Sequence, residues 1–108
     1  MTETKIYVGL TDATTRQEEH TTEEYLNILI IVCTSHHVSF TFILTKGGYF
    51  NENGEYTRKR TLVLTLIDAD KAVVDAIARD LCAFFRQEKV LITENTVTAY
   101  YIKEELPV

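Results

Sequence analysis

The residues best suited to bind a ligand are basic residues, glycines and tyrosines in the middle of the chain. The predicted ligand-binding residues are Lys46, Gly47, Gly48, Tyr49, Tyr56, Arg58, Lys59 and Arg60. Guanidinium forks and nearby glycine amides can hold phosphate or carboxylate groups, and a tyrosine ring can stack on a base. The combination suits a small anionic ligand, such as a nucleotide.

A structural explanation of the same residues carries equal weight. Natural proteins place charges on exposed sheet edges to prevent edge-to-edge pairing, and glycines there permit a bend. Neither the GxxxxGK[ST] nor the GxGxxG phosphate-binding pattern occurs in the chain. The ligand hypothesis therefore depends on composition and position alone.

Two strongly alternating segments must position these residues. Apolar and polar side chains alternate over Val38–Lys46 and again over Arg60–Ile67, which predicts two strands. The intervening Gly47–Thr57 contains Asn53-Gly54, a pair that favours a type I′ hairpin turn because both residues tolerate positive φ. We expect the two strands to continue through this insert as an arm that projects from the sheet.

The remaining elements complete a familiar order. We expect a strand over residues 4–10, a polar loop over Thr11–His20, and a helix to about residue 35 that starts at the Thr21–Glu24 capping box. A second helix follows a capping Asp68 or Asp70, and the last extended segment runs from 90 to 102 with a bulge or turn at Asn95. The order β-α-β-β-α-β predicts one α+β domain, residues 1–108, with a ferredoxin-like antiparallel sheet and both helices on one face.

The uncovered face of this sheet predicts self-association. If the alternating leucines and phenylalanines face the helices, the other face carries apolar side chains mixed with threonines. These are Tyr7, Ile43, Val63, Ile67, Tyr100 and Ile102. Because so much apolar area is rarely left in water, we expect a homo-oligomer: a dimer, trimer or hexamer.

Charge and segment lengths exclude several classes of function. The net charge of −5 argues against nonspecific binding to nucleic acid. The longest apolar runs, Ile28–Cys33 and Leu62–Ile67, are far shorter than a membrane span, and Met1–Lys5 lacks the features of a signal peptide. We therefore expect a cytoplasmic protein in which Cys33 and Cys82 are reduced and act as small helix-packing residues.

No motif in the sequence indicates a metal, a cofactor or a catalytic group. His36 and His37 are adjacent and lack carboxylate or cysteine partners at ligand spacing, so a helix-terminal role suits them better than a metal. Ser35 and Ser39 lie near His36 in sequence without the arrangement that acyl transfer requires. We predict no catalytic residues, no metal and no cofactor.

At the level of topology the whole chain resembles the PII signalling proteins and the CutA proteins. Its opening Lys5–Leu10, its Gly48-Tyr49…Gly54-Glu55 hairpin and its Gln87–Leu91 segment also resemble an uncharacterised bacterial ferredoxin-like domain family. The resemblance to the PII and CutA proteins implies that the chain forms trimers. The resemblance to the PII proteins also implies that a ligand binds in clefts between subunits. Gly47–Arg58 would then occupy the place of the loop that closes over the ligand and touches partner proteins. The arm is shorter than in PII proteins and lacks the nucleotide-binding signature expected there.

Three functions remain open from the sequence. The first is a non-enzymatic oligomeric sensor or sequestering protein for a small anionic, nucleotide-type ligand. The second is a bacterial or phage-encoded inhibitor that occupies a partner protein with the arm and the loop Thr11–His20. The third is a dimeric, cofactor-free oxygenase with an apolar pocket, for which the candidate residues are Tyr7, His37, Tyr100 and Tyr101.

Overall fold

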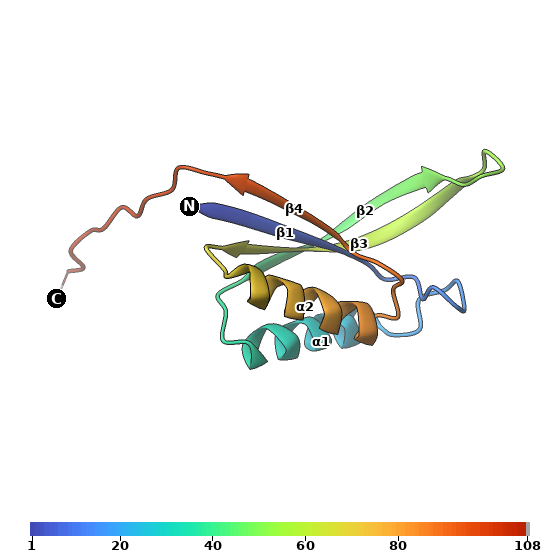
Figure 1. Ribbon diagram of the computed structural model, residues 1–108, viewed down its shortest axis with the longest axis horizontal. Helices are drawn as coiled ribbons and strands as arrows, with labels where there is room; N and C mark the ends of the chain where they lie inside the picture. The colour runs from blue at the N-terminus through green and yellow to red at the C-terminus, as the bar shows by residue number, and fades with distance from the viewer. Residues whose placement is uncertain (108) are drawn as a thin grey trace.

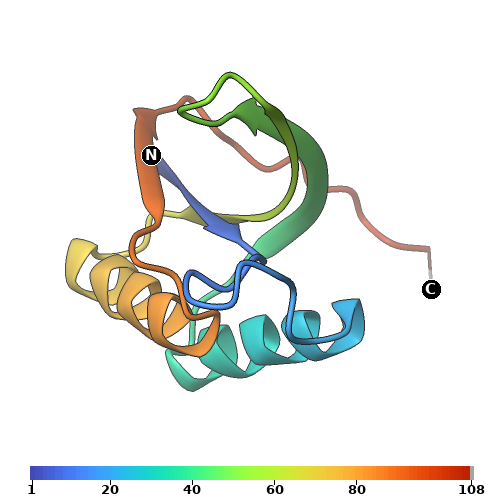
Figure 2. The same ribbon diagram turned by 90° about the vertical axis from the view of Figure 1, so that its right-hand side faces the viewer.

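The computed structural model describes residues 1–107 as one four-stranded antiparallel sheet with two helices (Figure 1). The elements in chain order are β1 (Thr2–Gly9), α1 (Thr22–Ser35), β2 (Thr41–Phe50), β3 (Tyr56–Ile67), α2 (Lys71–Phe84) and β4 (Leu91–Thr96). The strands lie in the order β2-β3-β1-β4, and both helices cover the same face of the sheet (Figure 2). The predicted ferredoxin-like α+β fold is confirmed.

The core forms between the helices and one face of the sheet. Alternate residues of β1 and β3, such as Ile6, Val8, Leu62 and Leu64, point to the helices and are fully buried. The helices contribute Tyr25, Leu29, Val32, Cys33, Val74, Ile77, Ala78 and Leu81 to the same cluster. The period-two pattern of the strands therefore identified the buried face correctly.

Local signals explain where the helices begin. The Thr21 hydroxyl accepts a hydrogen bond from the Glu24 N–H (3.2 Å) and the Glu24 carboxylate accepts one from the Thr21 N–H (2.9 Å), so the predicted capping box is present. For α2 the prediction is right about the capping position and wrong about the capping bond. Asp70 occupies the capping position without a side-chain bond, and Asp68, at φ 52°, instead accepts a hydrogen bond from the Thr2 N–H (2.8 Å).

The arm is a continuous ribbon, as expected. Pairing between β2 and β3 runs without interruption from Thr41–Thr65 to Phe50–Tyr56. The turn at its tip differs from the predicted type I′, because only Gly54 has positive φ (78°). The Asn51 carbonyl accepts from the Gly54 N–H, and the Asn51 side chain accepts from the N–H groups of Asn53 and Glu55, so a longer turn closes the hairpin.

The C-terminal segment departs most from the sequence prediction. β4 runs straight through Asn95, which pairs with Glu3, so Asn95 makes neither a bulge nor a turn. The strand stops at Thr96, and residues 97–107 continue beyond the end of the sheet with no secondary structure (Figure 1). Tyr100 and Ile102 therefore do not lie on the uncovered sheet face where the alternation put them.

One apolar row crosses that uncovered face. The strand register aligns Ile43 of β2 with Val63 of β3, Val63 with Tyr7 of β1, and Tyr7 with Leu91 of β4. Ile43 and Leu91, at the two ends of the row, are each 61% exposed. The next row towards the start of β1 is Thr41, Thr65, Lys5 and Thr93, so the apolar area is a narrow stripe.

No helix among residues 1–107 is long and apolar enough to cross a membrane.

Candidate functional site

A polar cleft of about 560 Å³ lies where three segments meet at the base of the arm. Its walls are the arm, the loop after β1, and the connection between α2 and β4. The lining residues are Gly9, Thr11, Asp12, Ala13, Arg16, Tyr49, Asn51, Thr57, Arg58, Lys59, Gln87, Glu88 and Lys89. Its volume lies within the range of small-molecule sites in proteins.

The hairpin register places Tyr49 and Lys59 on one face of the arm and Arg58 on the other. Gly47 pairs with Lys59 and Tyr49 with Thr57, so these side chains share the face turned away from the helices. Tyr49, Arg58 and Lys59 line the cleft. They are three of the eight residues that the sequence predicted.

The other predicted residues are placed elsewhere. Lys46 and Gly47 are exposed on β2 and do not line the cleft. The Tyr56 ring covers Gly48, where a Cβ atom would meet the ring itself, and packs edge-on against Phe50 with the ring centroids 5.7 Å apart. Gly48 and Tyr56 thus stiffen the arm as a packed pair.

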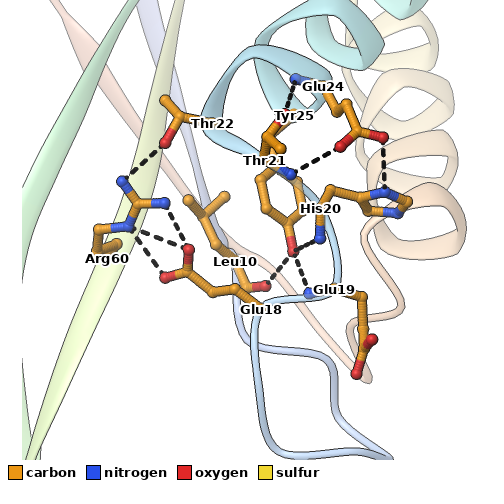
Figure 3. A network of polar contacts seen from close by, with 9 residues as sticks. All are labelled: Leu10, Glu18, Glu19, His20, Thr21, Thr22, Glu24, Tyr25 and Arg60. Atoms are coloured by element: carbon orange, nitrogen blue, oxygen red, sulfur yellow. Dashed lines mark hydrogen bonds and ion pairs between the residues drawn. The ribbon is translucent and has the colours of Figure 1, made fainter.

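Arg60 makes structural contacts within the chain. Its guanidinium donates to both Glu18 carboxylate oxygens and to the Thr22 hydroxyl, which fastens the loop after β1 to the first turn of α1 (Figure 3). The hydrogen bonds from Arg60 to Glu18 raise the pKa of the guanidinium, so its charge is fixed. Arg60 is therefore not a free cation for a ligand.

Residues distant in sequence complete the cleft, and most of them were not predicted. Lys59 of the arm crosses β1 at Gly9, where a Cβ atom would lie 3.3 Å from Lys59 Cε and 3.0 Å from Gln87 Oε1. Gln87 is held in turn, because its amide donates to the carbonyls of Thr11 (2.7 Å) and Phe85 (3.1 Å). Gly9 is thus the position at which the three walls come together.

The loop 11–20 is more firmly anchored than its polar sequence suggested. The buried Asp12 carboxylate accepts from the N–H groups of Thr14 (2.7 Å) and Thr15 (3.0 Å) and from Arg86 Nε (2.7 Å). The pKa of Asp12 lies below its ordinary value. The hydrogen bond from the Thr15 N–H is the largest cause, and the Thr14 N–H and the Arg86 charge lower the pKa further. Desolvation by burial acts in the opposite direction. The sequence alone gave no indication of this role for Asp12.

A second anchor fixes the far end of the same loop. The Tyr25 hydroxyl donates to the Leu10 carbonyl (2.9 Å) and accepts from the N–H groups of Glu19 (3.0 Å) and His20 (3.2 Å) (Figure 3). The ring itself is buried against Phe85. One wall of the cleft is therefore preorganised by buried hydrogen bonds.

The cleft combines charges of both signs. Arg16, Arg58, Lys59 and Lys89 supply positive charge, and Glu88 supplies a carboxylate that makes no ion pair within residues 1–107. The Asp12 carboxylate is already engaged by Thr14, Thr15 and Arg86. Such a site can take a polar ligand with an anionic group at one end and a ring that stacks on Tyr49.

The histidines lie outside this cleft. His36 ends α1, and its Nε2 lies 2.9 Å from Asp80 Oδ2 of α2, which links the two helices. His37 follows at φ 55° and turns the chain towards β2. Within residues 1–107, no three histidine, cysteine or carboxylate side chains lie close enough to hold a metal ion.

The three segments of the bacterial-family resemblance also meet at the cleft. The opening segment contributes Gly9, the hairpin contributes Tyr49, and the last segment contributes Gln87, Glu88 and Lys89. These residues are far apart in sequence, and the fold alone brings them to one place. That resemblance was the one sequence signal that pointed to the missed residues 87–89.

Comparison with known proteins adds information at the level of fold. No family model matches the sequence, and no curated protein is similar enough in sequence to match it. A phage SAM lyase in complex with S-methyl-5'-thioadenosine has a TM-score of 0.65 and 20% identity, covering 87% of this chain and 79% of the lyase chain. A phage SAM lyase in the apo state has a TM-score of 0.64 and 19% identity, with 94% and 92% covered.

Two further structures match more weakly. A DUF3240 family protein from Shewanella baltica has a TM-score of 0.52 and 10% identity, covering 95% of this chain and 97% of that one. The B. subtilis GlnK–ATP complex, a PII protein, has a TM-score of 0.46 and 15% identity, with 88% and 84% covered. The likeness to these solved structures is one of fold: this chain has the ferredoxin-like fold that they also have.

Proposed function

We propose that the protein is an oligomeric module that binds an adenosine-type ligand with an anionic group in the cleft at the base of the arm. One observation carries the proposal. Arg16, Arg58, Lys59 and Lys89 all line a preformed cleft that Tyr49 also lines. In a chain of net charge −5, this concentration of positive charge is local and specific.

Each wall has a distinct role in this proposal. Tyr49, half-exposed on the arm, stacks on the base. Thr57 and Asn51 offer hydroxyl and amide groups for the ribose hydroxyls. Lys59, Arg58 and Lys89 bind a phosphate or carboxylate, and Gly9 leaves room for the Lys59 and Gln87 side chains at the cleft wall.

The comparison with phage SAM lyase supports an adenosine-type ligand. One lyase structure holds S-methyl-5'-thioadenosine, on a fold that matches this chain with a TM-score of 0.65. S-adenosylmethionine combines the same thioadenosine group with a carboxylate, so it meets both requirements of the cleft. It is therefore the first ligand to test, with S-methyl-5'-thioadenosine and ATP beside it.

A second candidate function is cleavage of S-adenosylmethionine. Both lyase structures match most of this chain, and Glu88 places an unpaired carboxylate in the cleft, where it can sit near a sulfonium cation or accept a proton. In such a cleavage a base removes a proton from the carbon next to the one bonded to sulfur, a C=C bond forms in the amino acid part, and the C–S bond breaks with its electron pair staying on sulfur. The neutral thioether S-methyl-5'-thioadenosine then leaves without any oxidant or cofactor.

One experiment separates binding from cleavage. The purified protein is titrated calorimetrically with S-adenosylmethionine, S-methyl-5'-thioadenosine and ATP, and each mixture is then analysed by liquid chromatography for new products. Binding without a product indicates a sensor or sequestering protein. Formation of S-methyl-5'-thioadenosine above the rate of spontaneous decay indicates a lyase.

Variants assign the effect to the cleft. Lys59→Ala and Tyr49→Ala should each weaken binding about tenfold or more, the loss expected for one charge-assisted or stacking contact. Lys71→Ala is the matched control, because Lys71 is an exposed lysine on α2 paired only with Asp75. If none of the three compounds binds, or if Lys71→Ala weakens binding as much as Lys59→Ala, the proposal is wrong.

A further inference from the structure

The C-terminal segment exposes apolar side chains that the fold does not cover. Tyr100, Tyr101 and Ile102 are 79%, 85% and 80% exposed. The Met1 and Val97 backbones exchange hydrogen bonds at the end of the sheet, and no hydrogen bond joins residues 98–107 to the rest of the described chain. The segment runs on past the sheet (Figure 1).

The composition of this segment is that of a strand. Val97-Thr98-Ala99-Tyr100-Tyr101-Ile102 is rich in β-branched and aromatic residues and carries no charge. Such a stretch is a hazard for aggregation when it stays in water. An extended segment with apolar side chains on both faces fits best beside a sheet edge that is apolar on both faces.

The outer edge of β2 has that character. β2 is an edge strand of ten residues, with β3 as its only neighbour. On its helix-facing side Phe42 and Leu44 are half-buried, and on its other side Ile43 is 61% exposed. Charged residues and prolines protect edge strands from pairing. β2 contains one charged residue, Lys46, and no proline, so its outer edge is open to pairing.

The other sheet edge is less suitable. The outer strand there is β4, whose last four residues are Thr93, Glu94, Asn95 and Thr96. This edge offers few apolar contacts to an added strand. The tail's acidic Glu104 and Glu105 are, in contrast, complementary in charge to Lys46 and Lys59 beside β2.

We infer that residues 98–102 of one copy add as a strand to the outer edge of β2 in a second copy. The tail cannot easily reach its own β2, because it leaves from β4 at the opposite side of the sheet. Residues 97–106 contain no glycine, proline, asparagine or aspartate at which the chain would turn back. This inference deepens the oligomeric part of the proposed function and does not depend on which ligand binds.

Sedimentation of the ligand-free full chain tests the inference. The unaltered protein should sediment as an oligomer, and the double variant Tyr100→Ser/Ile102→Ser as a monomer with an unchanged circular dichroism spectrum. The matched control is Ile30→Ser/Ile31→Ser, which removes two exposed apolar side chains from α1 and should leave the oligomer intact. Because the Tyr100 and Ile102 side chains are exposed in their own chain, the tail variant should fold.

Cross-linking locates the contact. In a Cys82→Ser background, a copy with Ile43→Cys is mixed with a larger, tagged copy carrying Tyr101→Cys, and a short bis-maleimide is added. A covalent heterodimer should form, and should be absent when Ile31→Cys replaces Ile43→Cys. Any of three results would overturn the inference: a monomeric unaltered protein, an oligomer that survives the tail substitutions, or equal cross-linking at Ile31→Cys. Failed ligand titrations would overturn only the proposed ligand and would not affect this inference.

Discussion

The hydroxyl of Tyr25 donates a hydrogen bond to the carbonyl oxygen of Leu10, which joins the first turn of α1 to the end of β1. The Tyr25 hydroxyl oxygen also accepts hydrogen bonds from the N–H groups of Glu19 and His20, so one buried atom holds both ends of the loop that forms a wall of the cleft. This loop depends on a tertiary contact because its own sequence has no apolar face.

Tyr25→Phe should therefore destabilise the protein and loosen the loop. Loss of a buried hydroxyl that makes three hydrogen bonds costs about 1–3 kcal/mol, because its partners are left unsatisfied. Urea unfolding gives the free-energy change, and hydrogen exchange at Glu19 and His20 should become faster. Tyr101→Phe, which alters an exposed tyrosine, is the control and should change neither measurement.

Gly9→Ala should weaken ligand binding more than it weakens the fold. The new methyl group would lie 3.0 Å from Gln87 Oε1 and 3.3 Å from Lys59 Cε, so both side chains of the cleft wall must move slightly to make room for it. A several-fold loss of affinity in calorimetry is expected. Gly47→Ala is the matched control, because nothing lies within 4 Å of a Cβ atom there, and it should retain the original affinity.

The stabilising effect of Asp12 should disappear in acid. Its pKa is lowered in the folded protein, chiefly by the Thr15 N–H, so its contribution is complete above the unfolded value of about 3.9. That contribution is lost as the pH falls through the folded value. The difference in stability between the unaltered protein and Asp12→Asn should be largest near pH 7 and should shrink below pH ~4. A difference that stays constant down to pH ~2 would contradict this assignment.

The two cysteines should differ sharply in reactivity. Burial raises the pKa of the Cys33 thiol to about 11 and also blocks access to it, while Cys82 is half-exposed beside the groove between α2 and β4. At pH 8 a thiol reagent should therefore modify one thiol per native chain quickly and the second only after unfolding. Cys82→Ser should abolish the fast reaction, and a fast reaction that persists in this variant would show that Cys33 is accessible.

The sequence predicted those elements whose signals are local. Alternation along β2 and β3 gave the sheet and the buried face, and the Thr21–Glu24 box gave the start of α1. The turn type was wrong because the Asn51 side chain, two residues before Asn53, accepts two N–H groups and stabilises a longer loop. The tail was assigned to the last strand because its composition suits a strand, but composition does not show whether a partner strand exists.

The candidate site was predicted only in part, because most of its walls come together through the fold. Arg60 and Lys59 are neighbours in sequence, yet Arg60 is neutralised by Glu18, a residue 42 positions away. Alternation along the strand puts the two side chains on opposite faces, but it does not show that Glu18 lies beside Arg60. Asp12, Lys59 and Lys89 reach the cleft from three different segments, and a pattern read along the chain cannot reveal that meeting.

The arm beyond Lys46 is a ribbon whose two strands pair with each other alone. Apart from contacts such as the Tyr56–Gly48 packing, its side chains contribute little to the folding free energy, since exposed substitutions usually change stability by no more than about 0.5 kcal/mol. Substitutions at the tip of the arm and at its cleft-facing positions should therefore change the stability of the fold little. Substitutions in this ribbon could therefore change which ligand fits the proposed site while the rest of the fold stays the same.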